Sequence, residues 1–83
     1  MLFMITQVHT PETCPKDEGG ADTLIDKNAQ GLTVKGRWGA WPQHIIWYLV
    51  EVNSPDAIQK FLDPGMSRCT STVTPVAESP IKR

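Results

Sequence analysis

The chain has 83 residues, which is the length of one domain. Its 8 basic and 9 acidic residues leave a formal charge of −1, which argues against charge-driven binding to nucleic acid or to a membrane surface. With 40% hydrophobic residues and three tryptophans the chain is too apolar to be disordered. No apolar run approaches the roughly 18 residues of a membrane-spanning helix. Residues 1–8 lack the basic start and the cleavage site of a signal peptide, so we expect a cytoplasmic protein.

The first half of the chain predicts two strands and one weak helix. Leu2–His9 contains neither glycine nor proline and is rich in strand-forming residues, so it predicts a strand. Residues 11–20 contain two prolines and two glycines and predict a loop. Residues 22–30 predict a weak helix that ends at Gly31, and the alternating pattern of residues 32–38 predicts a second strand with one solvated face.

The second half begins with a predicted hairpin turn at residues 39–43, followed by the strongest strand pattern, at residues 44–52. Both faces of that strand are apolar, so we expect it to be central in the sheet. Ser54, Pro55 and Asp56 predict a helix start, with Ser54 as the cap. Residues 67–76 predict the last strand. The buried stripe of the helix is predicted to be Ala57, Ile58, Phe61 and Leu62.

The order strand, helix, strand, strand, helix, strand predicts an α+β fold of the ferredoxin-like kind. It has a four-stranded antiparallel sheet with two helices on one face and forms a single domain over residues 1–77, followed by a flexible tail at 78–83. The first and third strands are central and apolar on both faces. The helices cover one face only, so a second copy is expected to pack on the other, giving a homodimer or a higher even oligomer. The alternative is that the loop at residues 11–20 or the tail folds over that face.

Four short segments carry a resemblance to a known family. They are HTPETCP at residues 9–15, YLVEV at 48–52, SPDAI at 54–58 and TVTPV at 72–76. With them the chain resembles the dimeric α+β barrel proteins, and most closely their small uncharacterised branch. The resemblance implies a ferredoxin-like protomer, and its wider relatives include quinone-forming monooxygenases, muconolactone-type isomerases and haem-degrading enzymes. The chain departs from many of these in its short, glycine-rich first connection, which argues against a roomy pocket.

A candidate metal site consists of His9, Cys14 and His44. His9 ends the first strand and His44 begins the antiparallel strand beside it, so the two imidazoles are expected to approach each other, with Cys14 on the following loop. Imidazole and thiolate together suit copper or zinc. Haem is a further option, because Cys14-Pro15 is similar to a short haem-regulatory motif. The structural alternative is that both histidines are strand-end residues bonded to backbone or water. Cys14 and Cys69 lie in no C-x-x-C motif and are expected to be free thiols.

A candidate ligand site is aromatic. Trp41 in its glycine- and proline-rich loop is the expected ligand contact, together with Trp47 and Tyr48, while Arg37 neutralises an anionic ligand. The alternative is that the aromatic residues pack in the core and the dimer, and that Arg37 is solvated. Glu51 is expected to pair with Lys35 or Arg37 across the hairpin, and a buried Glu51 acting as a base is the other option.

Three functions remain open. The first is a binding or assembly module with a small pocket. The second is a cofactor-independent enzyme of the monooxygenase or isomerase kind, acting on a small aromatic or enol substrate, with His9 or His44 as the proton-transfer group. The third is a metal- or haem-binding protein. The chain contains no G-x-S-x-G, P-loop, dinucleotide or H-E-x-x-H motif, which argues against the corresponding hydrolases and nucleotide enzymes.

Overall fold

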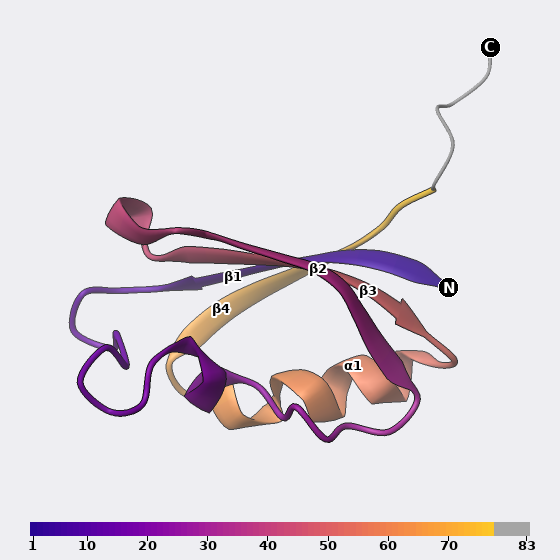
Figure 1. Cartoon of the computed structure of the whole chain (residues 1–83), viewed down its shortest axis with the longest axis horizontal. Helices are drawn as coiled ribbons and strands as arrows, with labels where there is room; N and C mark the ends of the chain where they lie inside the picture. The colour runs from indigo at the N-terminus through magenta and orange to yellow at the C-terminus, as the bar shows by residue number, and fades with distance from the viewer. Residues whose placement is uncertain (78–83) are drawn as a thin grey trace, which may run out of the picture.

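The structure is a computed structural model that describes residues 1–77, and its main element is a four-stranded antiparallel sheet (Figure 1). The strand order is β2-β3-β1-β4, so the first and third strands are central, as predicted. Every neighbouring pair is antiparallel. The strands are β1 (Leu2–His9), β2 (Leu32–Ala40), β3 (Ile45–Val52) and β4 (Cys69–Pro75). The predicted tail at 78–83 lies outside the described residues.

The predicted second helix is present as α1 (Pro55–Leu62) and begins at the proline, where the fixed φ and missing N–H suit the first helical position. The cap differs from the prediction, because the Ser54 side chain makes no capping hydrogen bond. The apolar stripe is buried as predicted, at Ala57, Ile58, Phe61 and Leu62. Within residues 1–77, no helix is long and apolar enough to cross a membrane.

The predicted first helix at residues 22–30 is wrong. One short 3-10 turn, η1 (Ala21–Leu24), stands there, followed by irregular chain. The backbone N–H of Asp26 donates to the carbonyl oxygen of Phe61 at 2.8 Å, and therefore does not close a helical turn. The Asp26 carboxylate accepts the N–H of Asn28 at 2.9 Å, a local bond that competes with helix formation. The tertiary contact and the aspartate turn thus replace the helix.

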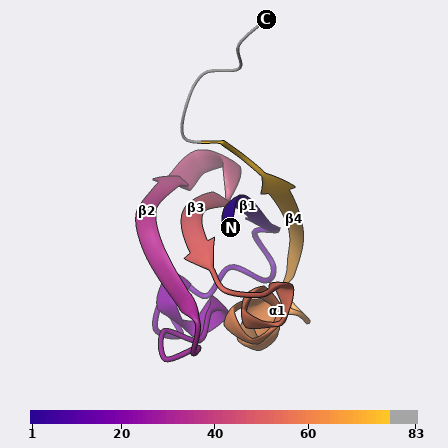
Figure 2. The same ribbon diagram turned by 90° about the vertical axis from the view of Figure 1, so that its right-hand side faces the viewer.

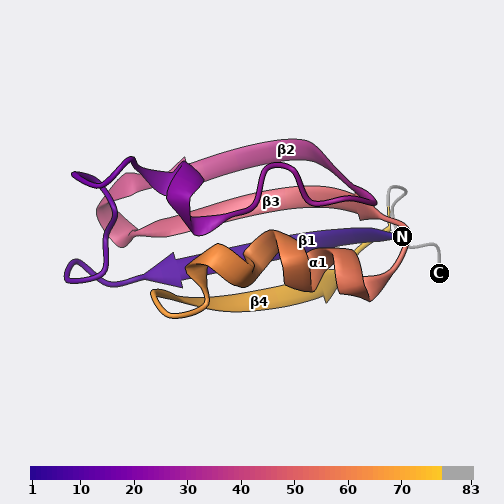
Figure 3. The ribbon, with the colours of Figure 1, turned by 90° about the horizontal axis from the view of Figure 1, so that it is seen from below.

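Helix α1 and the irregular chain that precedes β2 together cover one face of the sheet. Seen from below, α1 runs along β1 and β4, while the chain that precedes β2 runs along β2 and β3 (Figure 3). The end-on view places both on the same side (Figure 2). The core between them and the sheet includes the buried side chains Ile5, Leu24, Tyr48, Val50 and Phe61.

A buried polar network joins the irregular chain to the sheet. The Gln7 side chain is fully buried; its amide donates to the carbonyl oxygen of Leu24 at 3.1 Å, and Tyr48 donates its hydroxyl to the Gln7 amide oxygen at 3.2 Å. Gly65 lies against the same carbonyl, and a Cβ there would approach it to 2.6 Å. These bonds fix the chain near Leu24 without regular secondary structure, which sets the position of the loop before it.

The opposite face of the sheet carries apolar side chains and no helix. Cross-strand partners share a face, and the register pairs Met4 with Leu49 and Trp38 with Trp47. Trp38 is 53% exposed, and its indole lies over Gly36, where a Cβ would come within 2.4 Å of the ring. The apolar residues of this surface, here called the open face, are Leu2, Met4, Val8, Trp38, Ile45, Trp47 and Leu49.

Candidate functional site

His9 and His44 are held side by side by the backbone. His9 ends β1, and its N–H donates to the carbonyl oxygen of His44 at 3.1 Å. His44 follows the 3-10 turn η2 (Trp41–Gln43) and has a left-handed backbone, with φ 56° and ψ 45°, which costs a non-glycine residue about 1–2 kcal/mol. Its N–H closes the turn onto the carbonyl oxygen of Trp41 at 3.2 Å. The left-handed turn therefore directs His44 toward the end of β1.

The two imidazole rings meet edge to face. Nδ1 of His44 and Nε2 of His9 are 3.3 Å apart, and the ring centroids are 5.0 Å apart at an interplanar angle of 74°. Only one of the facing nitrogens can carry the shared proton. Among the described residues, Nδ1 of His9 is a buried side-chain nitrogen that has no hydrogen-bond partner. The pair therefore leaves part of the His9 ring unsatisfied.

Cys14 is brought to the same place by the loop of residues 11–20. One ligand atom from each of His9, Cys14 and His44 lies within 4.8 Å of the others. An ion pair between Glu18 and Arg68 ties this loop to the turn before β4. Both cysteines are free thiols, as predicted. The three side chains proposed from the sequence as metal ligands thus converge on one point.

The environment of the cluster favours neutral His9. Burial, and then the neighbouring His44, lower the pKa of His9 below its ordinary value of 6.5. A neutral imidazole has a free lone pair, which both a metal ligand and a general base require. Burial also raises the pKa of the Cys69 thiol, which is not part of the cluster, so that cysteine is un-ionised near neutral pH.

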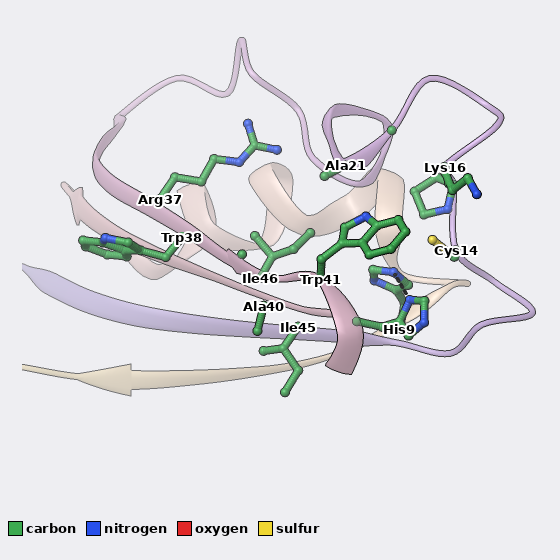
Figure 4. A pocket seen from close by; sticks show the side chains of 14 residues that line it. His9, Cys14, Lys16, Ala21, Arg37, Trp38, Ala40, Trp41, Ile45 and Ile46 are labelled. Carbon is green, nitrogen blue, oxygen red and sulfur yellow. Dashed lines mark hydrogen bonds between the residues drawn. The ribbon is translucent and has the colours of Figure 1, made fainter.

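A pocket of about 370 Å³ lies beside the cluster (Figure 4). His9, Cys14 and His44 line it, together with Trp41 and Lys16. This volume is at the lower end of the range of about 300–1,000 Å³ for small-molecule sites, in keeping with the expectation that the pocket is not roomy. The remaining lining comes from the loop, from η1 and from the strands of the β2–β3 hairpin.

The rim of the pocket combines an aromatic plane with a cation. Trp41 is 74% exposed, and the ammonium group of Lys16 lies 5.9 Å from the centroid of its ring. Lys16 was not among the residues proposed from the sequence, although it stands two positions after Cys14. Arg37 also lines the pocket, but its guanidinium is engaged with Asp22 at 2.7 Å and lies 5.3 Å from the ring of Tyr48. The cation most available to a ligand is therefore Lys16.

Two aromatic residues proposed as ligand contacts lie elsewhere. Tyr48 is fully buried and bonds to Gln7, and Trp47 points to the open face, so neither lines this pocket. The pairing of Glu51 with Arg37 is also not formed, because Arg37 binds Asp22. Glu51 is half exposed and meets the N-terminal amine at 3.3 Å, which excludes the buried base.

The fold and the site define a small α+β domain with an antiparallel sheet and a pocket beside a His–His–Cys cluster. The chain belongs to the family described as a domain of unknown function, DUF3303, whose model matches residues 1–80. Searches of curated proteins and of solved structures find no significant match.

Proposed function

We propose that the protein is a binding module whose pocket takes a small aromatic anion. The observation that carries the proposal is the rim, where the exposed indole of Trp41 and the ammonium group of Lys16 lie together over a cavity of about 370 Å³. An indole face stacks on a planar ligand, and the lysine compensates its charge. A domain that serves assembly alone needs only a filled interface, so the cavity favours ligand binding.

The test is a titration of the protein with 2-naphthoate, followed by amide chemical shifts. We expect shifts at residues 14–21 and 39–44, the two segments on either side of the cavity. Trp41→Ala removes the stacking surface and Lys16→Ala the charge, so each is expected to weaken binding about three- to tenfold. Lys60→Ala, which removes a cation from the exposed side of α1, is the matched control. A Lys16→Ala variant that binds like Lys60→Ala would contradict the proposal.

A second candidate is proton-transfer catalysis without a cofactor, as in a monooxygenase- or isomerase-like enzyme. The observation that favours it is neutral His9 at the wall of the cavity, with its pKa lowered mainly by burial. We expect the protein to speed deuterium exchange at the acidic carbon of phenylpyruvate, an aromatic compound that enolises. The exchange is followed by proton NMR in D₂O. His9→Gln and His44→Gln are expected to lose most of the rate, and equal rates in both variants and in wild type would remove this candidate.

We also propose that the protomer is ferredoxin-like and that a second copy covers the open face, as in a dimeric α+β barrel. The central positions of β1 and β3 and the single covered face of the sheet support this. The loop of residues 11–20 packs on the helix side, where Glu18 pairs with Arg68 and Cys14 faces the pocket. It is therefore not available to cover Trp47 and Leu49. A two-fold interface would pair this apolar surface with itself.

A further inference from the structure

We propose that His9, Cys14 and His44 bind one Zn²⁺ ion, with the fourth coordination position open to the pocket. Two imidazoles and a thiolate are donors that zinc prefers, and three protein ligands with one open position are the arrangement of reactive zinc sites. All three side chains line the same cavity, so a ligand or water could reach the ion from it. The inference does not depend on the proposed aromatic anion.

The distance between the two imidazole nitrogens supports the site. Zinc–nitrogen bonds of about 2.0–2.1 Å at a tetrahedral angle place two ligand nitrogens about 3.3 Å apart. Nε2 of His9 and Nδ1 of His44 are 3.3 Å apart in the protein without an ion. The two histidines therefore need little movement to share a metal.

Cys14 needs a larger adjustment, and its position in the chain permits it. Its ligand atom lies within 4.8 Å of both imidazoles, whereas a zinc-bound thiolate stands about 3.5 Å from each ligand nitrogen. Movement of the loop therefore has to shorten each of these distances by no more than about 1.3 Å. Cys14 lies in the loop of residues 11–20, outside the strands, so this closure breaks no sheet hydrogen bond.

The histidine pair is poorly satisfied without an ion. The separation of 3.3 Å between Nε2 of His9 and Nδ1 of His44 is longer than an ordinary nitrogen-donor hydrogen bond. An ion bound by these two facing nitrogens would replace this long contact with two metal–ligand bonds. The left-handed backbone of His44 adds to this, because strained residues cluster at ligand sites.

The net charge of the zinc-loaded site is expected to favour an anion in the adjoining pocket. One thiolate and two neutral imidazoles leave Zn²⁺ with a net charge of about +1, which an anionic fourth ligand or hydroxide would neutralise. Lys16 also lines the cavity and adds positive charge there. An anion in the pocket is therefore expected to bind more tightly to the zinc-loaded protein than to the zinc-free protein.

The test is a competition titration of zinc alone between the reduced, metal-free protein and a chromophoric chelator. We expect one ion per chain. Loss of a partner in the second coordination shell commonly costs 10- to 100-fold in metal affinity, so loss of a direct ligand in Cys14→Ser or His44→Ala is expected to cost about 100-fold or more. Cys69→Ser removes the other thiol and is the matched control, with unchanged affinity expected.

Cobalt provides a direct readout of the thiolate. Co²⁺ in the wild-type protein is expected to show a sulfur-to-cobalt charge-transfer band, which persists in Cys69→Ser and is absent in Cys14→Ser. This measurement on the wild type keeps the test decisive even if a variant folds poorly. Absence of the band, or zinc affinity unchanged in Cys14→Ser, would overturn the site. Binding of 2-naphthoate to the metal-free protein is a separate result, so the two proposals can fail independently.

Discussion

Replacing Phe61 by alanine is expected to lower the free energy of unfolding by about 3–5 kcal/mol, the usual cost of removing a fully buried aromatic ring. The Phe61 side chain is 1% exposed and meets the ring of Tyr48 edge to face, with centroids 5.3 Å apart. A domain of this size has a total stability of only about 5–15 kcal/mol. Urea unfolding followed by circular dichroism measures the change.

The effect is expected to be large because Phe61 connects both parts of the covered face. It lies on α1, and its ring packs in the core that also contains Leu24 from the irregular chain and Tyr48 from β3. Removal of the ring would leave a cavity next to Tyr48. Gln59→Ala, on the exposed side of the same helix, is the control and is expected to change stability by less than about 0.5 kcal/mol. Equal midpoints for the two variants would show that α1 is not essential to the core.

The strands were predictable because their signals are local. Leu2–His9 has the same bounds in the structure as in the prediction, and the two-sided apolar pattern correctly placed β1 and β3 at the centre of the sheet. The predicted helix at residues 22–30 failed because the deciding interactions are not local. Asp26 bonds to Phe61, which is 35 positions away along the chain (61 − 26), and no periodicity in the segment indicates that bond.

The candidate site was predictable where it depends on the sheet. Antiparallel neighbours bring the end of β1 to the start of β3, and this alone places His9 beside His44. The position of Lys16 depends on how the loop folds against the rest of the protein, including the ion pair between Glu18 and Arg68, and the sequence does not encode that locally. Trp47 and Tyr48 are adjacent in a strand, so they point to opposite faces of the sheet, and neither of them lines the pocket.

Trp47→Lys is expected to dissociate the proposed dimer. Trp47 lies on central strand β3, is only partly covered in the single chain and is paired across the sheet with Trp38. A tryptophan near the centre of an interface commonly contributes 2 kcal/mol or more, and two symmetry-related lysines would repel each other there. We therefore expect self-association to weaken about 30-fold or more. Sedimentation equilibrium over a range of protein concentrations measures the dissociation constant.

The matched control for this experiment is Gln59→Lys, which adds the same charge to α1 on the other side of the sheet. It is expected to leave the dimer intact, because only the open face is buried by the second copy. A wild-type protein that stays monomeric at every concentration would contradict the dimer. If Trp47→Lys and Gln59→Lys weakened self-association equally, the dimer would not depend specifically on the open face. Because Trp47 itself does not line the pocket, Trp47→Lys is expected to retain 2-naphthoate binding, which separates assembly from ligand recognition.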